Sequence, residues 1–141
     1  MARKGTPEIE QDIFDALEAF LSDRIGGTVY QGECRPLDSK EEDAVIIVSG
    51  AGSQQIQDGT AKVNIYVPDV DNGSGHPVPD KGRMQEISAL AESIIQTLND
   101  ADTDYNFDLE EGKAPKDYVN HENKQHFVNI SISFERITFN S

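Results

Sequence analysis

The sequence of 141 residues has no tryptophan and a single cysteine, Cys34. One cysteine cannot form a disulfide within the chain, so we expect a fold without bridges, which suits a reducing compartment. No run of about 20 apolar residues is present, and no basic start precedes an apolar segment with a small-residue cleavage site. We therefore expect neither a membrane protein nor a protein with a classical secretory signal.

Basic residues are also scarce. Twelve Lys and Arg stand against 26 Asp and Glu, which gives a formal net charge of -14. Phosphate binding requires clustered Lys and Arg, so specific nucleic-acid binding is not expected. An acidic surface instead favours solubility and selects basic or neutral partners.

Catalytic and cofactor-binding signatures are missing. The sequence has no phosphate loop, GxSxG elbow, HExxH helix or CxxC pair. Gly50-Ala51-Gly52 follows an apolar run, but no third glycine and no helix pattern follow it, as a dinucleotide-binding turn would require. The three histidines, His76, His121 and His126, have no recognised zinc spacing. We expect a chain that is not an enzyme and needs no cofactor.

The length fits one domain over residues 1–141, with residues 1–5 as a flexible tail. Residues 69–81 contain several Gly and Pro and predict a long exposed loop, and loops of this length in compact domains tend to be functional or disordered.

The strongest strand pattern covers residues 126–139, HFVNISISFERITF. Its apolar side chains alternate with polar ones and fall on one face: Val128, Ile130, Ile132 and Phe134. We predict the central strand of an antiparallel sheet. After Phe134 the apolar residues change parity, which predicts a β-bulge near Glu135 and Arg136.

Two segments have helical periodicity. Thr6 and Pro7 mark the start of the first, which ends before Gly26-Gly27, and Asp80 is the expected cap of the second, over residues 81–99. Each carries one apolar stripe: Ile9, Ile13, Phe14, Leu17, Phe20, Leu21 and Ile25 in the first; Met84, Ile87, Leu90, Ala91, Ile94, Ile95 and Leu98 in the second.

Further strands are predicted around residues 28–31, at 44–49 as a run buried on both faces, at 60–67 after an Asp58-Gly59 turn, and at 105–109. The expected order is α-β-β-β-α-β-β. This is an α+β fold with a mostly antiparallel sheet of four to five strands and two amphipathic helices packed on one face.

One acidic segment has the spacing of a calcium loop. The possible oxygen ligands occupy offsets 1, 3, 5, 9 and 12 of an EF-hand: Asp100, Asp102, Asp104, Asp108 and Glu111. Tyr105 stands at offset 6, where the sharp turn calls for glycine, and the exit helix is interrupted by Gly112 and Pro115. An acidic, solvated connection between helix and strand is the favoured interpretation, with calcium as the alternative.

Four segments together resemble the small tail-completion or tail-terminator proteins of long-tailed bacteriophages and prophages: EDAVIIVSG at 42–50, VNIYVPD at 63–69, RMQEISAL at 83–90 and HFVNISISFERI at 126–137. The resemblance covers residues 7–139. It implies a compact, non-enzymatic α+β subunit that assembles with copies of itself into a ring, typically a hexamer. Such a ring caps the tail tube and joins it to the head connector, so the implied location is the virion tail, and the host cytoplasm before assembly.

Two other functions remain open from the sequence. One is a monomeric acidic adaptor or inhibitor that presents its polar sheet face to a basic protein. The other is a calcium-binding protein that uses the acidic segment.

Overall fold

The computed structural model describes residues 5–49, 56–71, 73, 75–101, 104–110, 116–120 and 125–137. The elements in chain order are α1 (Thr6–Ser22), β1 (Val29–Gln31), β2 (Ala44–Ser49), β3 (Ile56–Pro68), β4 (Val70–Asp71), β5 (Pro77–Val78), α2 (Lys81–Ser88), α3 (Ala91–Ala101), β6 (Tyr105–Leu109), β7 (Lys116–Asn120) and β8 (Gln125–Ile137). The predicted α+β class is confirmed. The observed order, α-β-β-β-β-β-α-α-β-β-β, is longer than the predicted one.

The main sheet has the strand order β1-β2-β3-β8-β6, and β7 also pairs with β8, which makes six strands within the described residues. The β1 and β2 strands are parallel and the other pairs are antiparallel, so the sheet is mixed. β6 pairs with residues 132–136 of β8 and β7 with residues 125–129, both on the side of β8 away from β3. β8 is therefore the central strand that the sequence predicts.

The predicted β-bulge in β8 is wrong. The register between β3 and β8 runs without interruption, and Glu135 and Arg136 pair one-to-one with Asp58 and Gln57. Arg136 takes the next position on the helix-covered face and is 1% exposed, with its guanidinium carbon 5.9 Å from the centre of the Tyr105 ring. A long arginine stem can pack like an apolar side chain, so the strand needs no extra residue to keep this face filled.

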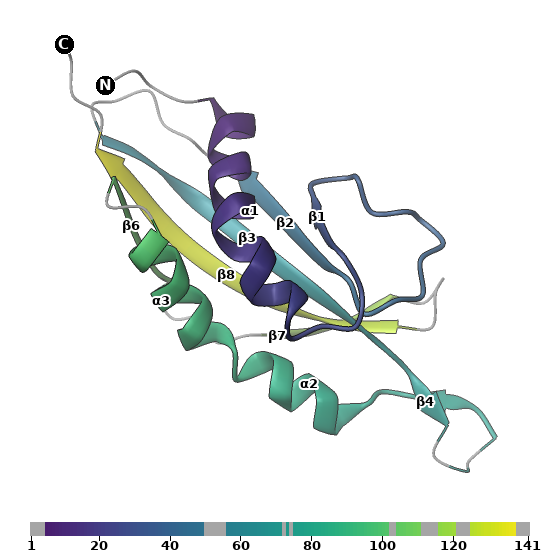
Figure 1. Ribbon diagram of the computed structural model, residues 1–141. Helices are drawn as coiled ribbons and strands as arrows, with labels where there is room; N and C mark the ends of the chain where they lie inside the picture. Colours follow the sequence, from purple (N-terminus) through teal and green to yellow (C-terminus); the bar gives the residue numbers. More distant parts are fainter. Residues whose placement is uncertain are drawn as a thin grey trace.

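All three helices cover the same face of the sheet (Figure 1). The buried residues of the helices and the inward-facing residues of the strands form one hydrophobic cluster. The helices contribute Ile9, Ile13, Leu17, Leu21, Met84, Ile87, Ala91, Ile94 and Leu98. The strands contribute Ala44, Ile46, Val48, Ala61, Val63, Ile65, Val67, Tyr105, Phe107, Val128, Ile130, Ile132 and Phe134. Apolar area removed from water contributes roughly 25 cal/mol per Å², so this single interface is the main source of stability.

The second predicted helix is divided in two. The backbone N–H of Leu90 bonds to the Ile87 carbonyl at 3.0 Å, a tighter turn than the α-helix allows, and α3 starts at Ala91. The apolar stripe nevertheless continues through both helices, because Met84, Ile87, Ala91, Ile94 and Leu98 are all buried. Two short helices at an angle follow a twisted sheet more closely than one straight helix can.

The helix caps agree in part with the sequence prediction. Asp80 caps α2 as expected, since its Oδ1 accepts a hydrogen bond from the Arg83 backbone N–H at 3.1 Å. The cap of α1 is Gly5 rather than Thr6, and the Glu8 side chain accepts a bond from the Gly5 N–H at 3.4 Å. No described helix is both long enough and apolar enough to cross a membrane.

Two strand predictions need correction, the turn at Asp58-Gly59 and the burial of the run at 44–49 on both faces. Asp58-Gly59 lies inside β3 and makes no turn, and β7 has no predicted counterpart. The run at 44–49 is buried on both faces only at its start: Val45, on the outer face, is 4% exposed, while Ile47 on that face is 37% exposed. The predicted loop at 69–81 contains the small β4–β5 hairpin.

Replacing Phe134 with alanine should lower the free energy of unfolding by about 3–5 kcal/mol, because the side chain is buried against Tyr105 and Phe107 and leaves a cavity. Urea denaturation measures the change. Leu37→Ala, which truncates a side chain that is 91% exposed, is the control and should change stability by less than about 0.5 kcal/mol. Equal losses in the two variants would contradict the proposed core.

Candidate functional site

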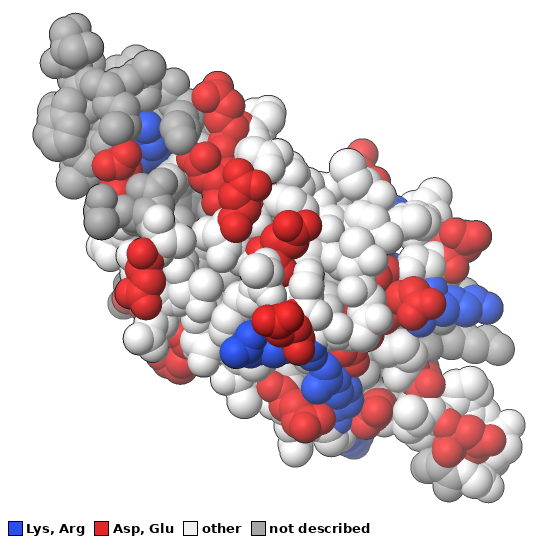
Figure 2. Space-filling view, in the orientation of Figure 1, with Lys and Arg blue, Asp and Glu red and all other residues white. Residues whose placement is uncertain are grey.

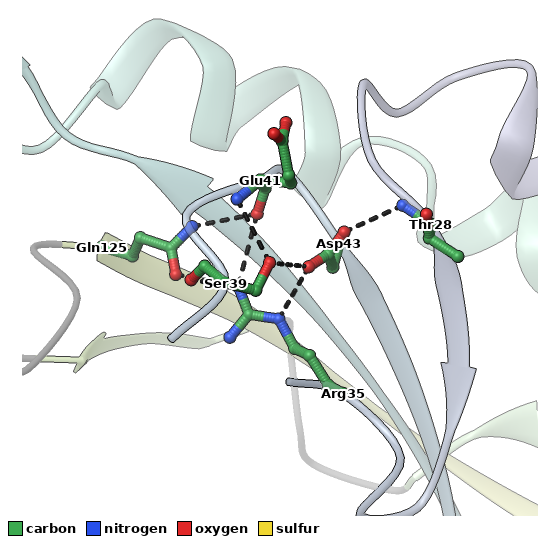
Figure 3. A network of polar contacts seen from close by, with 6 residues as sticks. All are labelled: Thr28, Arg35, Ser39, Glu41, Asp43 and Gln125. Atoms are coloured by element: carbon green, nitrogen blue, oxygen red, sulfur yellow. Dashed lines mark hydrogen bonds and ion pairs between the residues drawn. The ribbon is translucent and has the colours of Figure 1, made fainter. Parts of the chain in front are cut away.

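The outer face of the sheet, opposite the helices, carries the connection between β1 and β2, residues 32–43. A buried polar network holds this segment, called here the outer loop (Figure 3). Asp43 is its centre: Oδ2 accepts from Arg35 Nε at 2.9 Å and from the Ser39 hydroxyl at 2.5 Å, and Oδ1 accepts from the Thr28 N–H at 2.8 Å. The side chains of Arg35 and Asp43 are 8% and 1% exposed. A buried ion pair needs such added donors to offset its desolvation.

Gln125 joins the outer loop to the beginning of β8. Its side-chain oxygen accepts from Arg35 Nη2 at 2.9 Å, and its side-chain nitrogen donates to the Glu41 carbonyl at 2.9 Å. The Arg35 guanidinium also lies 3.8 Å from the centre of the Tyr66 ring, which in turn contacts the ring of Phe127. The outer loop is therefore anchored to two strands, to β3 through Tyr66 and to β8 through Gln125.

The anchored outer loop presents an apolar surface. Leu37 at its turn is 91% exposed and Ile47 on β2 is 37% exposed. Both line a shallow concavity of about 510 Å³, together with Val45, Tyr66 and four other residues of the outer loop, Gly32, Glu33, Arg35 and Pro36. We call this the outer concavity. A leucine left this exposed on a well-anchored loop is a candidate contact residue.

A second surface is the β4–β5 hairpin, which projects from the body of the molecule (Figure 1). Its base is fixed on both sides, by Asp69, whose Oδ1 lies 2.7 Å from His126 Nδ1, and by Asp80 at the α2 cap. Its tip turns through Gly73, whose φ of 91° favours glycine and whose N–H bonds to the Asp71 side chain at 2.8 Å. Val70 on this hairpin is 40% exposed.

Arg83 on α2 connects the outer loop to the helical layer. Its Nε and Nη2 donate to the two oxygens of Glu42 at 2.9 and 2.6 Å, and Nη2 also donates to the Arg24 carbonyl. The hydrogen bond to Glu42 raises the pKa of Arg83, so the guanidinium stays charged at any physiological pH. A bidentate contact thus joins the end of the outer loop to α2, and a further hydrogen bond joins α2 to the segment that follows α1.

Acidic side chains are spread over both sides of the molecule. Figure 2 shows many Asp and Glu and few Lys and Arg on the helical side. On the outer face, the exposed residues Asp58, Asp108 and Glu135 surround an open concavity of about 600 Å³. Asp58 and Glu135 are direct neighbours on β3 and β8. Like charges placed this close repel one another, which favours a cationic partner over a neutral one.

The candidate calcium ligands are dispersed in the described part of the chain. Asp100 lies in α3, Asp104 precedes β6 and Asp108 is on β6, so a straight strand occupies offsets 6–10 of the proposed calcium loop. Asp102 and Glu111 lie outside the described residues, and calcium binding stays a prediction. Among the residues that the structure describes, no three His, Cys, Asp or Glu side chains are grouped closely enough to hold a metal ion.

No protein-family model and no curated protein matches the chain.

The buried network is the feature that sequence reasoning missed. Arg35 and Asp43 are eight residues apart and Gln125 is 90 residues from Arg35, so no local spacing connects them. In the sequence, the only sign of the network was that Arg35 and Asp43 carry opposite charges within a polar stretch. Such pairs are usually exposed to solvent.

Gly27→Ala should destabilise the protein by about 1–3 kcal/mol, because an added Cβ would collide with the Asp43 carboxylate and lie 2.5 Å from the Glu42 carbonyl oxygen, and would push apart the segments that lead into β1 and β2. Gly26→Ala is the matched control, since its Cβ would meet only the Glu42 Cβ at 4.0 Å. Thermal unfolding of the two variants checks this, and equal melting temperatures would contradict the close approach.

Asp43→Asn should lower the free energy of unfolding by about 3–5 kcal/mol, because it leaves the buried Arg35 guanidinium without its counter-charge. Asp38→Asn, in the exposed part of the same loop, makes the same chemical change and should have little effect. Urea denaturation at neutral pH compares them. A similar stability for both variants would show that the network does not anchor the outer loop.

Proposed function

We propose that the chain is a structural protein of a phage or prophage tail, which forms a ring with copies of itself, caps the tail tube and joins it to the head connector. The proposal rests on the presence of two unlike surfaces on the same chain, the projecting β4–β5 hairpin and the outer concavity. The sequence resemblance supplies the tail context.

A ring of identical subunits needs a head-to-tail contact in which two different surfaces of each copy meet. A projecting hairpin and a concavity satisfy this requirement, because neither can pair with itself through shape alone. Both are firmly attached, the hairpin through Asp69 and Asp80 and the concavity through the Arg35–Asp43 pair. Anchored surfaces lose little conformational entropy when they associate, which favours assembly.

The net negative charge of the chain supports the same function. DNA has to pass through the ring of a tail terminator, and a lumen rich in Asp and Glu repels phosphate and lets the DNA slide. The net charge of -14 supplies these groups in excess. The proposed protein has no catalytic step, and its partners are copies of itself and other tail or head-connector proteins, in the virion tail and in the host cytoplasm before assembly.

A second candidate is a monomeric adaptor or inhibitor that binds a basic protein. The exposed carboxylates of Asp58, Asp108 and Glu135 on the open sheet face favour it, because they form a concave acidic surface. This function requires no contact between copies.

Native mass spectrometry over a concentration series should show one closed oligomer of fixed size growing at the expense of the monomer, because a head-to-tail contact that closes leaves no free surface. Negative-stain images of the same sample should show rings. A monomer at every concentration, together with binding to a basic protein, would favour the adaptor instead. A ladder of increasing sizes would indicate an open, non-closing contact and would contradict the ring.

A further inference from the structure

We infer that the β4–β5 hairpin of one copy docks into the outer concavity of the next copy, with Val70 in contact with Leu37 and Ile47 and with Lys62 opposite the acidic hairpin. The inference deepens the proposed function and rests on it, because it assigns the contact that would close the ring.

The exposed apolar side chains point to these two surfaces. Among the described residues, the large apolar side chains that are clearly exposed are Leu37 at 91%, Val70 at 40% and Ile47 at 37%. Two of them line the outer concavity and the third lies on the projecting hairpin. Apolar area on a projection and in a concavity of the same chain is what a head-to-tail contact between copies requires.

The position of Lys62 adds charge complementarity. An acidic chain repels its own copies, so a contact between them must place one of its few cations against an acidic segment. Lys62 is exposed on β3 directly beside Ile47, and no ion pair to it is found within the described residues. Residues 69–80 contain three Asp and no Lys or Arg. Glu33 and Arg35 both line the concavity, and Lys62 lies beside its Ile47.

The three Asp residues in and beside the hairpin make different contacts. Asp69 contacts His126 and Asp80 caps α2, so replacing either would disturb the attachment of the hairpin. Asp71 is exposed, and among the described residues its side chain accepts a local bond from the Gly73 N–H. Asp71 is therefore the acid at which charge can be changed with the least effect on the fold.

A cross-linking experiment tests the contact between copies directly. In a Cys34→Ser background, one sample carries Leu37→Cys and the other carries Val70→Cys, so that neither chain can form an internal disulfide. Mild oxidation of the mixture should give a covalent dimer that contains one chain of each kind. The control mixture pairs Leu37→Cys with Ser93→Cys, an exposed site on α3 away from the hairpin. No dimer, or the same yield with the control, would overturn the inference.

Charge reversal tests the role of Lys62 in the same assay. Lys62→Glu in the chain that carries Leu37→Cys should lower the initial cross-linking rate roughly three- to tenfold, since a weak attraction becomes a repulsion at a partly exposed site. Adding Asp71→Lys to the chain that carries Val70→Cys should restore the rate. Lys81→Glu, made in place of Lys62→Glu in the chain that carries Leu37→Cys, changes the net charge equally and should have little effect on the cross-linking rate. An equal loss with Lys81→Glu, or no restoration, would contradict the assigned pairing.

The outcomes separate the inference from the proposed function. If the unmodified chain forms rings in native mass spectrometry and the specific cross-link is absent, the ring uses other surfaces and only the inference fails. If the chain stays monomeric and the cross-link is absent, both fail. A specific cross-link with the predicted charge dependence supports both.

Discussion

Thirteen consecutive residue pairs join β3 to β8 in one unbroken register, and every second pair faces the helices. This ladder sets most of the structure. Because the side chains on a strand alternate between faces, a single register places Ala61, Val63 and Ile65 opposite Ile132, Ile130 and Val128 in the same apolar layer. The helices have one face on which to bury their stripes, and they all use it.

The same alternation leaves the other face of the ladder with polar and charged side chains and only partial cover. The outer loop covers one end of it, and an ion pair that is almost completely buried fixes that cover in place. The cost of desolvating Arg35 and Asp43 is offset only because Thr28, Ser39 and Gln125 complete the hydrogen bonds around them.

The excess of acid limits how such a chain can associate. Every contact between copies brings negative surfaces together, and at physiological ionic strength this repulsion extends over about 8 Å. A small contact that combines an apolar projection with a lysine between neutral side chains is one arrangement that overcomes it. The acidic end of the sheet, around Asp58 and Glu135, is a separate concavity on the same outer face.

The sequence by itself determined the first helix and the alternating strand at the C-terminal end, both of which have strong periodicity. It also determined the Asp80 cap and, except for its burial, the strand at 44–49. Each of these is set by neighbours within a few residues. Tertiary structure decided the break at Leu90, the strand course through Asp58-Gly59, and the burial of Arg136, because each depends on pairing with or packing against a distant segment. It alone brought Arg35, Asp43 and Gln125 together, since a hydrogen bond between residues 90 positions apart leaves no periodic trace in the sequence.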